Sequence, residues 1–163
     1  MPDPVVSQRT IPVEHVRIES AKPFAEVKAA FEGSVPQLDT GSFTLLQRGE
    51  SDHARQKLER GPELSIFGSR DHGALLQITG QHSRAVQYDI GNPLTATRMT
   101  QHQLSASLYA PLRVVLYENE AGHAILEYDL PSSLFGQFGD ERVTAVAREL
   151  DASIEGALVK AAC

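Results

Sequence analysis

The chain has very little cysteine and no tryptophan: Cys163 is the one cysteine among 163 residues. An intrachain disulfide is therefore excluded, and we expect a cytoplasmic protein. The net charge is −6, and lysine and arginine are scattered along the chain. The basic stripe that binds nucleic acids or anionic membrane surfaces is thus missing. No apolar run reaches the ~18 residues of a membrane helix, and no secretory signal is visible. We expect neither a nucleic-acid nor a membrane partner.

Short motifs for metals and cofactors are also missing. The six histidines show no metal-ligand spacing, and there is no CxxC pair or Asp-rich calcium loop. Neither a GxGxxG nor a Walker loop occurs, and no GxSxG elbow indicates an α/β-hydrolase. The sequence therefore predicts no cofactor and no metal site.

The apolar content is sufficient for one core, because hydrophobic residues make up 41% of the chain. The length fits a single domain. Residues 1–10 include two prolines and show little periodicity. We expect a flexible arm over 1–10 and a single domain over 11–163.

Apolar periodicity and turn residues predict the order of the elements. A first strand is expected within 10–20, followed by a helix capped by Ser20 with Pro23 in its first turn. Residues 34–50 fit either a helical turn or a short strand. The other expected elements are helix 51–60, strand 64–70, helix 74–79, strand 85–90, helix 93–102, a hairpin over 112–129 and a helix over 141–161 behind an Asp140 cap. This order predicts an α+β fold, with a mostly antiparallel or mixed sheet of about five strands and helices on one face.

The turn "SRDHG", residues 69–73, joins an expected strand to an expected helix. It contains Asp71 and His72. An imidazole beside a carboxylate can exchange a proton near neutral pH, because its ordinary pKa is about 6.5. Asp71 is also a favoured capping residue, and His72 would then have only a structural role. The pair is a candidate catalytic site, with capping as the alternative.

The stretch "QYDIGNPLTATRM", residues 87–99, runs from a strand into a helix start. Asn92 can cap the helix, and Pro93 suits its first turn. Free N–H groups and a partial positive charge at such an end attract anions. Arg98 and Arg113 could add a full positive charge. The alternative is an ordinary capped helix.

Three tyrosines lie in expected strands: Tyr88, Tyr117 and Tyr128. If they face the same way, their hydroxyl groups can line a ligand pocket. If they face the helices, they are core residues with bonded hydroxyls.

Several of these segments together resemble a known family. They are the Asp71-His72 turn, the Gly91-Asn92-Pro93 turn, the strand "APLRVVLYE", the strand end "EYDLP", the lead-in "FGQFGD" and the last amphipathic helix. From residue 64 to 158 the chain resembles the bacterial domain of unknown function 302. The resemblance implies a compact α+β fold, often paired as a homodimer, and implies no particular activity. The polar helix over 51–60 is expected to be an addition to that family's core.

Three functions are compatible with the residues. The first is a module that binds a small molecule, with an anionic metabolite as one possibility. Its pocket would lie between the Asp71-His72 turn and the Asn92 helix start, at a shared rim. The second is a cofactor-independent acid–base enzyme that uses His72 oriented by Asp71. The third is a homodimeric interaction protein whose interface is the hairpin over 112–129 or an edge strand.

Overall fold

The computed structural model describes all 163 residues. Its five strands form one antiparallel sheet in the order β1-β5-β4-β3-β2. The strands are β1 (His15–Pro23), β2 (Ser65–Asp71), β3 (Ala85–Gly91), β4 (Leu112–Glu118) and β5 (His123–Asp129). The predicted α+β fold is confirmed.

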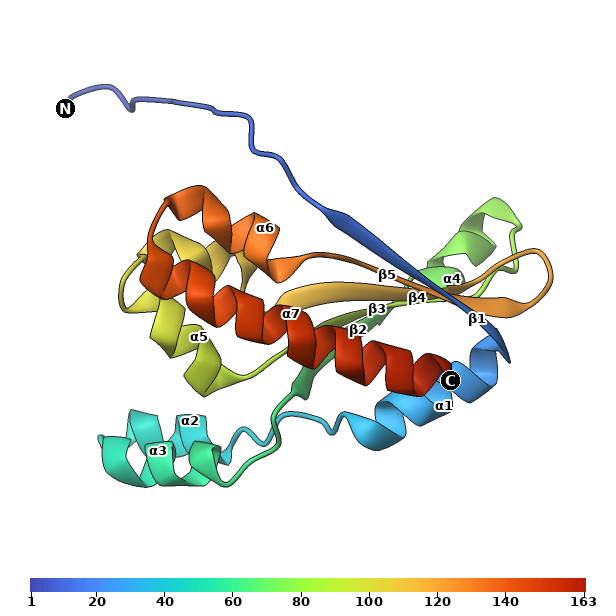
Figure 1. Cartoon of the computed structure of the whole chain (residues 1–163), viewed down its shortest axis with the longest axis horizontal. Coiled ribbons are helices and arrows are strands. Elements are labelled where there is room, and N and C mark those ends of the chain that lie inside the picture. Colours follow the sequence, from blue (N-terminus) through green and yellow to red (C-terminus); the bar gives the residue numbers. More distant parts are fainter.

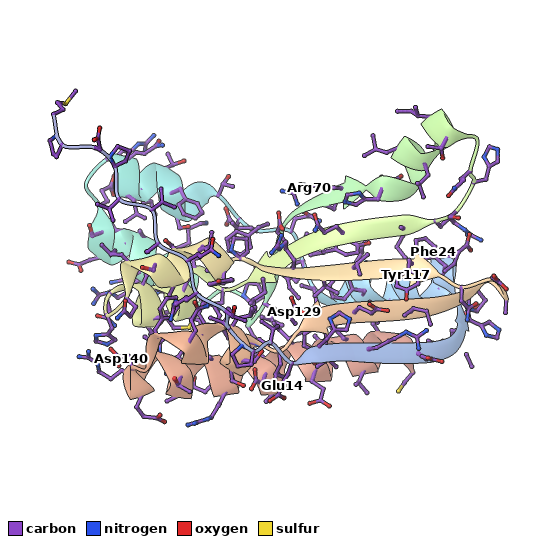
Figure 2. The ribbon with its side chains drawn as sticks, turned by 90° about the horizontal axis from the view of Figure 1, so that it is seen from above. Glu14, Phe24, Arg70, Tyr117, Asp129 and Asp140 are labelled. Atoms are coloured by element: carbon purple, nitrogen blue, oxygen red, sulfur yellow. The ribbon has the colours of Figure 1, made fainter.

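The chain also forms seven α-helices and three short 3-10 helices (Figure 1). They are α1 (Phe24–Ser34), α2 (Gly41–Gln47), α3 (Ser51–Glu59), α4 (His72–Leu76), η1 (Gln77–Thr79), α5 (Pro93–Thr100), η2 (Leu104–Tyr109), α6 (Pro131–Phe135), η3 (Gly136–Phe138) and α7 (Glu141–Ala162). Of these, α6, η3 and α7 follow the last strand. Helices α1 and α7 lie along one face of the sheet. Figure 2 shows the other face, across which no helix runs. None of the helices is both long and apolar enough to cross a membrane.

The core lies between the sheet and helices α1 and α7. Along β3, the side chains of Val86, Tyr88 and Ile90 are buried on this face, as strand alternation predicts. From α7 the large buried side chains recur every three or four residues and so lie on one helix face: Val143, Val146, Leu150, Ile154 and Leu158. Each such side chain stabilises the fold by about 1.5–3 kcal/mol when it is removed from water.

The prediction that Ser20 caps the first helix is wrong. Strand β1 continues to Pro23, which pairs with His123 of β5, and α1 begins only at Phe24. The Ser20 hydroxyl instead donates a 2.6 Å hydrogen bond to the carbonyl oxygen of Ala162. Strand pairing and this link to the end of α7 outweigh the local capping preference of serine.

The helix expected over 74–79 corresponds to α4 and η1, but several other short helices were not predicted from the sequence pattern. Helix α2 falls in the ambiguous segment 34–50, and α6, η2 and η3 have no predicted counterpart. Elements of three to seven residues contain at most two turns, too few for a 3.6-residue period to show. At the start of α3 the N-cap position is held by Glu50, and no side chain caps the helix.

No helix or strand precedes His15, and this N-terminal segment extends beyond the sheet (Figure 1). It is held at two points. The Arg9 guanidinium donates to the backbone and side-chain oxygens of Gln137, at 3.2 and 2.7 Å. Nearer the sheet, the backbone N–H of Leu130 donates to the Glu14 carbonyl oxygen at 2.8 Å.

Candidate functional site

The Asp71-His72 turn and the Asn92 helix start, which we call the two corners, lie at opposite ends of the paired strands β2 and β3. In the strand register Asp71 pairs with Val86, whereas Gly91 pairs with Ser65. A strand of this length spans about 20 Å, at about 3.3 Å per residue. The expected shared rim between the Asp71-His72 turn and the Asn92 helix start is therefore wrong. In a parallel sheet the carboxyl ends of adjacent strands lie side by side. Because β2 and β3 are antiparallel, their carboxyl ends lie at opposite ends of the pair.

The Asp71-His72 turn has the geometry of a helix cap. The Asp71 Oδ1 atom accepts a 2.9 Å hydrogen bond from the backbone N–H of Ala74, which caps α4. Both Asp71 and His72 are exposed, and no hydrogen bond joins their side chains. The capping interpretation is confirmed, and a catalytic role for His72 stays a prediction.

The three tyrosines do not share a face. Tyr88 and Tyr128 are buried beneath the helices, at 1% and 4% exposure, whereas Tyr117 lies on the open face. The Tyr88 hydroxyl donates to the Glu32 carboxylate at 2.7 Å, and burial together with this bond raises the pKa of Tyr88. A common tyrosine wall is thus excluded. Tyr88 and Tyr128 belong to the core.

The two arginines also lie away from the Asn92 corner. The Arg98 guanidinium donates to both carboxylate oxygens of Glu149, at 2.7 and 2.9 Å, and so ties α5 to α7. This hydrogen bonding raises the pKa of Arg98. Arg113 lies on the open sheet face, opposite Asp89 in the register. Neither arginine lines either of the two hollows beside Asn92 that are described below.

The open face carries a cluster of titratable groups at the β1 edge. The two ring nitrogens of His15 lie 2.9 Å from the carboxylates of Glu127 and Asp129. Hydrogen bonds to Asp129 and Glu127 raise the pKa of His15, and the Tyr117 hydroxyl and His15 lower the pKa of Glu127. Both imidazole nitrogens are engaged, so this histidine is not free to act as a base. No group of His, Cys, Asp or Glu side chains in the structure is arranged to hold a metal ion.

The hairpin proposed as a dimer interface lies inside the sheet. Strand β4 pairs with β3 and β5, and β5 pairs with β4 and β1. The hairpin therefore has no free backbone edge, and only β1 and β2 are edge strands. A homodimer stays a prediction, and its interface would involve an edge strand or the open face.

The Asn92 corner is organised by a single side chain. Its Oδ1 atom accepts hydrogen bonds from the backbone N–H groups of Leu94 and Thr95, at 2.9 and 3.2 Å. Its Nδ2 group donates to the carbonyl oxygen of Glu63 at 3.0 Å. The predicted cap is confirmed. Two of the free donors at the helix start are thus already satisfied by the protein.

An apolar pocket of about 260 Å³ opens beside this corner. Its lining includes the buried side chains of Ile90, Met99 and Phe135, together with residues of α2, α5 and the segment before β4. The apolar residues that line it are Phe43, Leu46, Leu58, Phe67, Ile90, Pro93, Ala96, Met99, Ala110, Pro111, Leu112, Phe135 and Leu150. Phe43 and Leu46 of α2 are 40% and 46% exposed, so part of their apolar surface borders the opening of this hollow. We call this hollow the corner pocket.

A second, polar hollow of about 460 Å³ adjoins the corner pocket. Leu58, Asn92 and Pro93 line both, so the two hollows adjoin at these residues. The polar hollow lies between the α2–α3 pair and the segment leading into β2. Its polar lining comprises Asp39, Ser42, His53, Gln56, Lys57, Arg60 and Ser65. We call it the polar cleft.

Of the predicted site residues, only Asn92 borders these two hollows. The other lining residues come from segments far apart in the chain and carry no local motif. One signal was available: Phe43 and Leu46 are two large apolar residues in a short segment, "GSFTLLQ", whose partners the sequence pattern did not show.

The family model for "Domain of unknown function DUF302" matches residues 51–161, well over half of the chain. The chain belongs to the DUF302 family. Because the match begins at Ser51, helix α3 is part of the family domain, and the expectation that it is an addition is wrong.

Comparison with solved structures agrees with this family. The chain is similar to the crystal structure of an uncharacterised conserved DUF302 protein from Bacillus stearothermophilus, with a TM-score of 0.66 and 17% sequence identity. The alignment covers 90% of this chain and 97% of that one. At this identity the likeness shows a shared fold. No curated protein matches the chain.

Proposed function

We propose that the protein binds a small molecule whose apolar part occupies the corner pocket. The observation that carries this proposal is the pocket itself: aromatic and aliphatic side chains line a hollow beside a helix start that the Asn92 side chain caps. Small-molecule sites have this character, an apolar lining with a few fixed polar groups. Phe43 and Leu46 keep apolar surface in contact with water, and a ligand would cover that surface.

The volume sets the size of the apolar part. The pocket measures about 260 Å³. At about 30 Å³ per heavy atom, the volume per molecule in liquid water, it accommodates roughly eight or nine heavy atoms. A medium-length alkyl chain or a phenyl group with a short linker has this size.

Binding of a homologous series of straight-chain alcohols tests the proposal. Each added methylene, from 1-butanol to 1-octanol, should tighten binding about fourfold, because burying one CH₂ contributes about 0.8 kcal/mol. Affinity should then level off once the pocket is full. Calorimetric titration measures the series, and the rise in melting temperature provides a second measurement. Absence of chain-length dependence would contradict the proposal.

Variants on α5 show whether binding occurs in this pocket. Ala96 is half-buried and lines the pocket, so Ala96→Phe should fill it and abolish binding of 1-octanol. Thr97 is exposed at the rim, and Thr97→Phe should obstruct entry with little effect on the core. The control is Ala29→Phe on the exposed side of α1, which should bind 1-octanol like the unmodified protein. Unchanged binding in both α5 variants would overturn the proposal.

A further inference from the structure

The hydroxyl group of Ser42 is buried and has no hydrogen-bond partner. It is the one buried side-chain polar atom in the chain that lacks a partner, and the residue has 0% exposure. Native proteins rarely leave such a group unsatisfied, because its desolvation is then uncompensated. Ser42 borders the polar cleft. A polar atom of a ligand in the cleft could accept this missing hydrogen bond.

The charges around the cleft favour an anion. The chain as a whole carries −6, yet the ionisable residues lining the cleft are Lys57, Arg60 and His53 against the single acid Asp39. His53 lies 3.0 Å from the carboxylate of Glu50, so it adds no free positive charge. The Lys57 ammonium lies 2.7 Å from the Asp39 carboxylate, so these two charges largely compensate each other. Arg60 forms no ion pair in the structure and is exposed. It therefore supplies an uncompensated positive charge within a negatively charged protein.

We propose that the ligand is an amphipathic carboxylate, with its apolar chain in the corner pocket and its carboxylate in the polar cleft. This inference rests on the proposed function, since it assigns the head group of the same ligand. Leu58, Asn92 and Pro93 border both hollows, so the chain and the head group of one ligand would lie on either side of these residues. The Ser42 hydroxyl donates to the carboxylate, and Arg60 balances its charge. Guanidinium and carboxylate groups match in shape and charge.

Three probes of equal chain length test this assignment: octanoate, 1-octanol and octylammonium. Octanoate should bind about tenfold more tightly than 1-octanol, because its carboxylate makes a few partly exposed charge interactions in the polar cleft. Octylammonium should bind more weakly than 1-octanol. Raising the salt concentration should weaken octanoate binding and leave 1-octanol binding unchanged.

Variants separate the head-group contacts from the pocket. Arg60→Gln should weaken octanoate at least threefold and leave 1-octanol unaffected. Ser42→Ala should also weaken octanoate, while leaving the ligand-free protein as stable or more stable, because an unsatisfied buried hydroxyl is removed. Arg55→Gln is the matched control: Arg55 is an exposed arginine of α3 outside the cleft, and its loss changes net charge equally. It should leave both affinities unchanged.

The outcomes distinguish a failure of the head-group assignment from a failure of the proposed small-molecule binding. If 1-octanol binds in the corner pocket but octanoate is no tighter, the head-group assignment is overturned and the pocket stands. If none of the three probes binds, the proposed function itself fails, and the assignment fails with it. If octanoate binds equally well to Ala96→Phe, its alkyl chain does not occupy the corner pocket, which also overturns the assignment.

Discussion

The side chain of Asn92 donates a hydrogen bond to the carbonyl oxygen of Glu63, 3.0 Å away, while its own oxygen caps helix α5. One amide thus fixes the start of α5 to the segment that enters β2. This contact sets the shared boundary of the corner pocket and the polar cleft.

Replacing Asn92 separates its two contributions. Asn92→Ala removes the cap and should destabilise the protein by about 1–2 kcal/mol. Asn92→Asp keeps an accepting oxygen for the cap but loses the donor to Glu63 and places a carboxylate beside that carbonyl group. It should therefore destabilise the protein also, by roughly 1 kcal/mol. Urea unfolding of both variants measures the two effects. An Asp variant as stable as the unmodified protein would show that the Glu63 contact contributes nothing.

Asp71 and His72 should respond differently to replacement. Asp71→Ala removes the hydrogen bond to the Ala74 N–H group and should cost about 0.5–1 kcal/mol for so short a helix. His72→Gln should leave stability unchanged, because His72 is exposed and no hydrogen bond from its side chain is present. Thermal unfolding compares the two. A large loss of stability in His72→Gln would reveal a structural role for the imidazole that the fold does not show.

The His15 cluster predicts a pH dependence of stability. Hydrogen bonds to Asp129 and Glu127 raise the folded-state pKa of His15 above its ordinary value of 6.5. The folded state then holds this proton more tightly than the unfolded state. The resulting stabilisation is fully present below pH 6.5 and is lost as the pH rises through the raised pKa. It should amount to less than about 1 kcal/mol, because the ring is exposed.

Unfolding measured between pH 5.5 and pH 9, a range chosen around the histidine pKa, tests this expectation. His15→Gln should remove the loss of stability on going to alkaline pH. His82→Gln, which replaces an exposed histidine outside the sheet, controls for the loss of an imidazole. Identical pH profiles for the unmodified protein and His15→Gln would show that the β1 edge is held without this proton.

Much of the fold was predictable because its long elements have strong periodicity. The α7 stripe with its Asp140 cap and the alternation of Val86, Tyr88 and Ile90 both follow from local sequence, and the structure confirms them. Strand order does not follow from local sequence. Antiparallel pairing of β2 with β3 separates Asp71 from Gly91, and no turn motif encodes that pairing.

The candidate site was less predictable for the same reason. Asn92 was identified from its capping signature, but the residues around it are brought together by tertiary packing. Ser42 illustrates the difficulty: a serine in a short polar segment has no distinguishing pattern, and its buried, unpartnered hydroxyl is visible only in the folded chain.

The most direct test of the account uses the methionine methyl groups. The chain contains two methionines, Met1 and Met99; Met99 is buried at the corner pocket, and Met1 is fully exposed at the N-terminus. The methyl spectrum of protein labelled with ¹³C at the methionine methyl carbons should therefore show two resonances. Titration with 1-octanol should shift the Met99 resonance in a saturable manner and leave the Met1 resonance in place. A Met99 resonance that does not move while the alcohol binds elsewhere, or no saturable binding at all, would contradict the claim that the corner pocket is the ligand site.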